Sequence, residues 1–221
     1  MELEIINATK IIDKKIILDN INLKLKGGRI YGLRGKNGTG KTMLFRLISG
    51  LIFPTEGRVI INGEELGKEI SFPRSVGILI ENPGYIPNFS GFKNLKIISN
   101  IKGIIGDEKI IDTMTLLGLD PYSKKKVKKY SLGMKQKLGL AMAVMEEPDL
   151  IILDEPINAL DEASVKIVHD LLQSHKARGA LIIIASHDRE ELDLLADEIF
   201  VMENGRITET ESTKRESLNH E

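Results

Sequence analysis

The sequence predicts an α/β protein in which a helical segment interrupts a mixed sheet. Short runs rich in Val, Ile and Leu recur along the 221 residues, and several are followed by stretches with helical spacing. Between residues 83 and 130 this alternation stops, because residues 92–101 and 107–117 are both typical of helices and no strand is predicted between them. An α/β core with a helical insert is therefore the expected fold.

The predicted strands fall into two groups. Residues 21–25 alternate apolar and polar side chains, as half-buried strands do, and residues 58–61 lead into an Asn62-Gly63 turn, so we expect antiparallel pairing here. Asn204-Gly205 predicts another hairpin turn, which leads to a short edge strand at residues 206–208. Five other runs are continuously apolar, as in the buried strands of a parallel sheet: residues 29–33, 76–80, 150–153, 181–185 and 199–202.

The composition excludes several classes of protein. With 31 Lys and Arg against 32 Asp and Glu the formal net charge is −1, so we expect no nucleic-acid partner bound through bulk positive charge. The absence of cysteine excludes disulfides, cysteine-ligated metal sites and a thiol nucleophile. No apolar run approaches the roughly 18 residues needed to cross a bilayer, and the first ten residues do not resemble a signal peptide. These features predict a cytoplasmic chain.

Two polar stretches are expected to lie at the surface. Residues 124–129 contain five lysines around Val127, which we interpret as a solvated loop or helix edge. Residues 210–221 are almost wholly polar, so we expect this tail to fray.

The strongest functional signal is GKNGTGKT at residues 35–42, which fits the P-loop pattern. A predicted strand precedes the motif and an apolar pattern with helical spacing follows it, as the strand–loop–helix arrangement requires. Lys41 is expected to reach the β- and γ-phosphates and Thr42 to ligate Mg²⁺. The expected phosphate-binding residues are Gly35, Lys36, Asn37, Gly38, Thr39, Gly40, Lys41 and Thr42.

A second signal is an apolar run that ends in two acids, Asp154 and Glu155. Such a pair at the end of a strand is about as often a helix cap or a turn as a functional site. With a P-loop upstream, the functional interpretation is favoured, as a Walker B element. Asp154 is then expected to hold Mg²⁺, and Glu155 to orient or deprotonate the attacking water.

Three further motifs, in this order, resemble those of the ATP-binding cassette (ABC) ATPases. YSLGMKQ at residues 130–136 is similar to the family's signature sequence, with Ser131 and Gly133 at its two least dispensable positions. INALD at residues 157–161 resembles the D-loop, which includes Asp161, and ASHD places His187 at the position of the switch histidine. The resemblance runs from about residue 3 to residue 208.

The resemblance implies a single domain with a P-loop NTPase core, a RecA-like mixed sheet with an antiparallel β subdomain, and an inserted helical subdomain. Residues 1–82 and 137–209 would form the nucleotide-binding core, residues 83–136 the helical subdomain and residues 210–221 a polar tail. ATP and Mg²⁺ are the implied cofactors. Glu155 would be the base or water-orienting residue, and His187 would contact the γ-phosphate.

The implied partners are a second cassette chain and a separate transmembrane permease. In a head-to-tail dimer, ATP on one chain would be capped by Ser131 and Gly133 of the other, and a homodimer or a heterodimer would both satisfy this requirement. The permease would press on the insert, with Tyr85, Ile86 and Phe89 as expected contacts. The chain would then lie peripherally on the inner face of the cell membrane.

Two departures from the family pattern carry information. Glu81 replaces the glutamine that usually precedes the helical insert, which is similar to the bacitracin-resistance and lantibiotic-immunity branch. We expect its carboxylate near Mg²⁺ or the attacking water, the alternative being a surface loop acid. The aromatic residue that often stacks on adenine is replaced by Ile11 or Ile12, and we assign the contact to Ile12.

Three classes of function are considered. The main hypothesis is a transport ATPase subunit, with peptide-antibiotic export or immunity suggested by Glu81. The alternative is a soluble ABC-type ATPase that remodels a protein or nucleic-acid partner. Long coiled-coil insertions or a second cassette would favour this alternative, and the sequence contains neither. A catalytically silent module is disfavoured because Glu155 and Ser131 are both intact.

Overall fold

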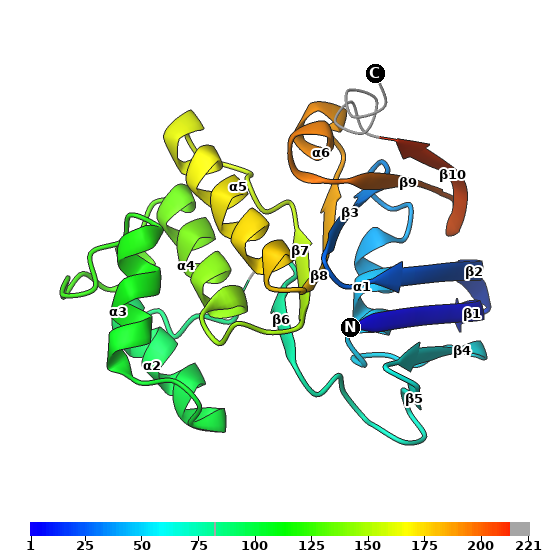
Figure 1. Ribbon diagram of the computed structural model, residues 1–221, viewed down its shortest axis with the longest axis horizontal. Helices are drawn as coiled ribbons and strands as arrows, with labels where there is room; N and C mark the ends of the chain where they lie inside the picture. Colours follow the sequence, from blue (N-terminus) through cyan, green and yellow to red (C-terminus); the bar gives the residue numbers. More distant parts are fainter. Residues whose placement is uncertain (82, 213–221) are drawn as a thin grey trace.

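The protein consists of two β-sheets with helices between and beside them (Figure 1). Our computed structural model describes residues 1–81 and 83–212. Helix α1 (Lys41–Ile48) packs between an antiparallel sheet and a mostly parallel sheet, and the other helices cover the opposite face of the parallel sheet. The α/β fold with an antiparallel part and a helical insert is confirmed.

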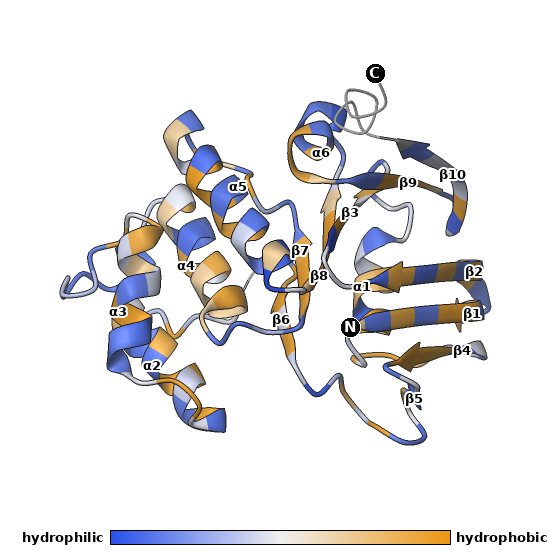
Figure 2. Ribbon diagram, viewed as in Figure 1, coloured by the Kyte–Doolittle hydropathy of each residue, from blue (hydrophilic) through white to orange (hydrophobic). Residues whose placement is uncertain are grey.

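The antiparallel sheet has the strand order β2-β1-β4-β5. Figure 2 shows apolar and polar residues alternating along β1 and β2. Leu3 and Ile5 are buried, whereas Glu4 points to the other face and pairs with Lys24. The strands predicted at residues 21–25 and 58–61 belong to this sheet. Its members are β1 (Glu2–Ile12), β2 (Lys15–Lys26), β4 (Glu56–Ile61) and β5 (Glu64–Glu65).

The second sheet has the order β10-β9-β3-β8-β7-β6, with every neighbouring pair parallel except β10 and β9. The five continuously apolar runs all become parallel strands, as predicted. The members are β3 (Arg29–Arg34), β6 (Val76–Leu79), β7 (Leu150–Asp154), β8 (Leu181–Ser186), β9 (Glu198–Glu203) and β10 (Arg206–Ser212).

The parallel strands are apolar throughout because both faces of their sheet are covered. In β7, Leu150 and Ile152 point toward α1 and the antiparallel sheet, whereas Ile151 and Leu153 point toward the other helices. All four side chains are 0% exposed. Alternate residues of this strand therefore belong to two separate hydrophobic cores. A substitution on one face is expected to leave the packing of the other core intact.

Among the described residues, three helices beside the parallel sheet contact it directly, and the two helices that lie wholly within the insert pack on one of these three. Helices α2 and α3 pack on each other and on α4, and α4 also packs on β6 and β7. Because α4 runs through residues 136 and 137, one continuous helix crosses the expected boundary between the insert and the core. The helices are α2 (Gly91–Lys102), α3 (Asp107–Leu116), α4 (Leu132–Val144), α5 (Glu162–Ala177) and α6 (Arg189–Leu195), with a 3-10 turn at Val127–Lys129.

The last strand is longer than predicted. An edge strand at residues 206–208 and a fraying tail from residue 210 were expected, but β10 continues to Ser212 and pairs with β9. The carboxylate of Glu211 accepts hydrogen bonds from Arg34 and Arg189, which holds this polar end in place. The prediction was wrong here because a polar composition does not reveal ion pairs with distant residues. The remainder of the expected tail, residues 213–221, lies outside the described residues.

None of the helices in the described part of the chain is long and apolar enough to cross a membrane.

Candidate functional site

Three loops meet at one edge of the parallel sheet. Strands β3, β8 and β7 are adjacent, in this order, and parallel strands present their carboxyl ends on the same side. The P-loop joins β3 to α1, β7 ends at Asp154, and His187 directly follows β8. The sheet therefore brings together three motifs that lie far apart in the sequence.

Two glycines of the P-loop are required by its backbone. Gly40 has a φ of 108° at the start of α1, a conformation that side chains other than glycine rarely adopt. At Gly35 a Cβ atom would lie 2.6 Å from the backbone oxygen of Met202 and 2.6 Å from Thr39 Oγ1. The loop can therefore curve tightly, as a loop that turns backbone amides toward a ligand must.

Lys41 is folded back onto the P-loop. Its ammonium group donates to the backbone carbonyl oxygens of Gly35 and Lys36, and the residue is only 7% exposed. Burial lowers the pKa of Lys41, and the nearby carboxylates of Asp154 and Glu155 oppose this shift. A positive group is thus held within the loop, where phosphate oxygens would bind.

Thr42 and Asp154 face each other between α1 and β7. The Thr42 hydroxyl donates to Asp154 Oδ2 over 3.1 Å. Burial raises the pKa of Asp154, while the hydrogen bond from Thr42 lowers it. The structure therefore brings together two of the three residues predicted to hold Mg²⁺.

Glu81, the third predicted Mg²⁺ ligand, is paired with an arginine. Glu81 Oε1 accepts from Arg46 Nη2 over 2.8 Å, and the Glu81 backbone is left-handed, with a φ of 55°. Within the described ranges, no group of three His, Asp or Glu side chains forms a ready metal site. Any bound Mg²⁺ would need ligands from outside the protein, which agrees with the preference of this ion for phosphate oxygens and water.

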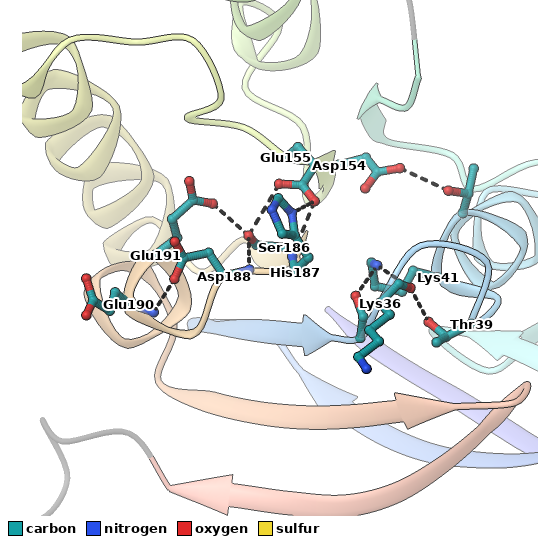
Figure 3. A network of polar contacts seen from close by, with 12 residues as sticks. Lys36, Thr39, Lys41, Asp154, Glu155, Ser186, His187, Asp188, Glu190 and Glu191 are labelled. Carbon is teal, nitrogen blue, oxygen red and sulfur yellow. Dashed lines mark hydrogen bonds and ion pairs between the residues drawn. The ribbon is translucent and has the colours of Figure 1, made fainter.

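Glu155 lies at the centre of a polar network (Figure 3). His187 Nδ1 is 2.8 Å from Glu155 Oε1. The Ser186 hydroxyl lies 3.3 Å from Glu155 Oε2 and 2.6 Å from Glu191 Oε2, so that the two carboxylates share its one proton. The hydrogen bond with Glu155 and the charge of that carboxylate raise the pKa of His187. Glu155 itself has a φ of 50°, and a left-handed glutamate at the end of a strand is an uncommon, strained conformation.

Two cavities flank the P-loop. One, of about 260 Å³, contains Lys41, Thr42, Asp154 and Glu155, together with Ile17, Asn37, Gly38, Gly40 and Met43. The other, of about 420 Å³, contains Gly35, Lys36, Thr39 and His187, with Arg34, Arg189 and residues 201–204. The predicted phosphate-binding residues therefore line both sides of one loop, and the contact between His187 and Glu155 joins a residue of the larger cavity to one of the smaller.

The apolar residue beside the P-loop is Ile17, which sequence analysis missed. Ile17 on β2 lines the smaller cavity, whereas Ile11 and Ile12 are each 38% exposed and line neither cavity. The run IIL after the β1–β2 turn was an available signal, but the alternation along β2 alone does not show which residue faces the P-loop.

The signature residues lie at the start of α4. The Ser131 hydroxyl accepts from the Met134 amide over 3.2 Å, so Ser131 is the N-cap of the helix. A Cβ atom at Gly133 would lie 2.8 Å from the backbone oxygen of Ala159, so this close approach requires glycine. Ser131 is exposed, and neither residue lines the two cavities beside the P-loop.

Gln136 links the signature helix to the acidic loop, and its role was not predicted. Its side-chain amide donates to the backbone carbonyl oxygens of Glu155 at 2.8 Å and Pro156 at 3.1 Å. The residue was visible as the last letter of the signature-like motif. The contact joins residues 19 and 20 positions apart, which spacing alone could not predict.

Asp161 is the N-cap of α5. Its carboxylate accepts from the Ser164 amide over 2.8 Å, and hydrogen bonding by the side chain and then by the backbone of Ser164 lowers the pKa of Asp161. The structure therefore gives Asp161 a local role in beginning a helix, whatever a partner chain adds.

The residues predicted to contact a permease differ in exposure. The Tyr85 hydroxyl donates to the backbone oxygen of Lys135, and burial raises the pKa of Tyr85 to about 12. Phe89 is half-buried, and the Lys93 ammonium group lies over its ring, 3.9 Å from the ring centroid. Ile86 is 39% exposed. The expected patch is therefore smaller than the sequence indicated, because Tyr85 belongs to the helical core.

Comparison with known proteins places these motifs in one family. A family-wide sequence profile described as ABC transporter matches residues 18–158. The chain is 51% identical over 209 residues to an uncharacterized ABC transporter ATP-binding protein, YybJ of Bacillus subtilis (strain 168), which covers 95% of this chain and 96% of that protein. It is 39% identical over 206 residues to the bacitracin transport ATP-binding protein BcrA of Enterococcus faecalis, covering 92% and 67% of the two chains.

A further relative and a solved structure agree with this assignment. The lantibiotic transport ATP-binding protein SrtF of Streptococcus pyogenes is 36% identical over 217 residues, covering 98% of this chain and 93% of that protein. The dimeric structure of a post-hydrolysis state of the cassette MJ0796, bound to ADP and Pi, matches with a TM-score of 0.85 at 21% identity, over 96% and 99% of the two chains. The fold is thus that of a P-loop NTPase cassette. The chain belongs to the ABC transporter family and is an ATP-binding cassette ATPase.

Proposed function

We propose that this chain binds and hydrolyses ATP to power a separate membrane permease that exports a peptide antibiotic. The observation that carries the proposal is the single cavity shared by Lys41, Thr42, Asp154 and Glu155. These four residues supply a cation, a hydroxyl and two carboxylates beside the P-loop backbone, which is the set that phosphoryl transfer needs.

Mg²⁺ fits the donors that are present. The Thr42 hydroxyl and the Asp154 carboxylate are oxygen donors 3.1 Å apart, and Mg²⁺ characteristically takes one or two carboxylates, substrate phosphates and water. When bound, the ion would neutralise charge that develops on the phosphates. Thr42 and Asp154 would hold it, with Glu81 close enough to add a further oxygen once it leaves Arg46.

Glu155 is assigned the role of base or water-orienting group. Glu155 directly follows the buried strand β7, and its carboxylate contacts His187 and Ser186 on one side. Orientation by two partners suits a group that must accept a proton at a fixed position. His187 is assigned the contact to the γ-phosphate, because it lines the cavity on the other side of the P-loop.

A second chain is assigned the role of completing each site. Ser131 and Gly133 lie at the N-terminal end of α4, where helix amides and a hydroxyl suit an anion, yet they line neither P-loop cavity of their own chain. The relative MJ0796 has been described as a dimer bound to ADP and Pi. We infer a head-to-tail dimer, in which Ser131 of one chain caps the ATP of the other.

We infer the class of cargo from the names of the relatives, and the permease contact from exposed apolar residues. BcrA is named for bacitracin transport and SrtF for lantibiotic transport. We assign permease docking to two exposed apolar residues, Ile86 at the start of the insert and Phe72 in the segment before β6, which are 39% and 57% exposed. This assignment places the working subunit peripherally on the inner face of the cell membrane.

The test is reconstitution of the chain with its permease. We expect a membrane protein to co-purify with the chain, and the complex to hydrolyse ATP and protect a sensitive host from bacitracin or a lantibiotic. Glu155→Gln should assemble equally but give no protection. The combined variant Ile86→Ser/Phe72→Ser should lose the permease while keeping the basal ATPase. Stimulation by nucleic acid or a soluble protein, with no membrane partner, would instead favour a remodelling ATPase.

A further inference from the structure

Arg46 occupies a position that no motif of the family explains. It lies on α1 four residues after Thr42, so that both side chains project from the same side of the helix, one turn apart. Its guanidinium donates to Glu81 Oε1 over 2.8 Å. The pair therefore joins the helix that follows the P-loop to the segment that follows β6.

The charges around this pair explain why a cation is useful there. Asp154, Glu155 and Glu81 are three carboxylates near one another, and the charges of Glu155 and Glu81 both help to raise the pKa of Asp154. Lys41 is bonded to the P-loop carbonyl oxygens rather than to these acids. Arg46 is thus the cation in direct contact with Glu81, and it offsets the charge that glutamate adds in place of glutamine.

We propose that Arg46 is a positioning residue that holds Glu81 beside the Mg²⁺ site but away from the ion. The inference rests on the proposed function, because it concerns the same Mg²⁺ and ATP. In the free chain Arg46 keeps the Glu81 carboxylate on the α1 side, and Mg²⁺ must compete with the guanidinium for the same oxygen. Arg46 thereby sets the Mg²⁺ concentration at which the nucleotide site is completed.

The contact is suited to exchange rather than to permanent structure. The Arg46 and Glu81 side chains are 38% and 55% exposed, and a partly exposed ion pair contributes little to stability. Its loss should therefore leave the fold intact. The same weakness lets a divalent ion draw Glu81 away at modest cost.

A double-mutant cycle tests the proposal without measuring hydrolysis. The Mg²⁺ concentration for half-maximal binding of trinitrophenyl-ATP is measured by fluorescence for the parent chain, Arg46→Gln, Glu81→Gln and the double variant. We expect Arg46→Gln to lower this concentration, and to do so roughly two- to fivefold more in the parent background than in the Glu81→Gln background. Loss of a positive charge acts equally in both backgrounds, so only the contact produces the difference.

Two controls and the parent chain separate the outcomes. Arg74→Gln removes another exposed arginine, which pairs with Glu64 in the antiparallel sheet, and should leave the Mg²⁺ requirement unchanged. Arg46→Lys, which keeps the charge, should restore most of the parent value. Equal effects of Arg46→Gln in both backgrounds, or a raised Mg²⁺ requirement, would overturn the role of Arg46. A parent chain without Mg²⁺-dependent nucleotide binding would overturn the proposed function instead.

Discussion

The P-loop region and the signature region of this chain are built very differently. Around the P-loop, Lys41 is buried and bonded to its own loop, and Thr42 contacts Asp154 across the cavity. At the signature, Ser131 is exposed and bonds only locally, as the cap of α4. The P-loop region is assembled by contacts within the chain, whereas the signature region is an ordered, exposed helix start.

This difference teaches which steps a single chain can perform. A preorganised loop with buried partners can bind phosphate after exchanging only the Lys41 contacts to its own carbonyl oxygens. An exposed serine at a helix start contributes only when a ligand is brought to it by another chain. We therefore expect ATP binding to depend on the P-loop region alone and hydrolysis to depend on both, and four substitutions can break or sharpen this division.

The largest effect is expected for Glu155→Gln. Losing a general base typically slows a reaction by roughly 10² to 10⁴-fold, while the amide keeps the size of the side chain. Hydrolysis should fall by this amount and ATP affinity should not. Phosphate release gives the rate, and size-exclusion chromatography with ATP should show a longer-lived dimer. Retained hydrolysis would mean that another group, such as His187, activates the water.

Ser131→Ala tests the signature region alone. Loss of a hydrogen bond to a charged phosphate should lower hydrolysis roughly 10- to 100-fold, with nucleotide binding by the single chain unchanged. Ser90→Ala is a matched control, because Ser90 caps α2 as Ser131 caps α4. Both variants should lose about 1 kcal/mol of stability in denaturant unfolding. If Ser90→Ala slowed hydrolysis as much, the effect would come from helix stability rather than from the phosphate.

His187 should make hydrolysis depend on pH. Its raised pKa means that the protonated imidazole pairs with Glu155 and stabilises the folded chain. This contribution is fully present below pH 6.5, the ordinary pKa of histidine, and disappears as the pH rises through the raised pKa. Deprotonation also releases the Glu155 carboxylate, so hydrolysis should rise over the same range by up to about tenfold per pH unit. His187→Gln should flatten the profile. An unchanged profile in this variant would assign the pH dependence elsewhere.

The smallest effect concerns the wall of the P-loop cavity. Ile17→Ala should weaken ATP binding roughly fourfold, equivalent to losing the burial of about one CH₂ group, whereas Ile12→Ala should have less effect. Fluorescence titration of the two variants compares them directly. The reverse order would show that the base rests on Ile12, as the sequence predicted. In that case Ile12→Tyr should increase the preference for ATP over GTP by adding a stacking surface.

The sequence predicted the elements well where the signal was local. Continuous apolar runs became parallel strands because both faces of that sheet are covered, as Leu150 and Ile151 illustrate. The P-loop was visible because its glycines are needed at fixed spacing. Position 40 needs glycine for its backbone conformation, and position 35 needs glycine because neighbouring atoms lie so close. In each case the residue types that the structure requires lie within a short stretch of the chain.

The sequence failed where a contact joins distant segments. Gln136 bonds to the Glu155 carbonyl, Arg46 pairs with Glu81, and Glu211 accepts from both Arg34 and Arg189. Each partner choice depends on how strands and helices pack, and the residue types alone allow many other pairs. Ile17 was missed for the same reason, because the orientation of β2 relative to the P-loop is a tertiary property.

Gln136 has a mechanical consequence for the dimer. Helix α4 is 13 residues long, or about 20 Å, and its first turn contains Gly133 while its second contains Gln136. A rigid helix that is pulled at its start toward the neighbour's triphosphate must carry the Gln136 amide with it. Because that amide holds the backbone carbonyls of Glu155 and Pro156, occupancy of one nucleotide site in the proposed dimer would be transmitted as a displacement to the Glu155 loop of the other. The two sites would then hydrolyse ATP one after the other rather than independently.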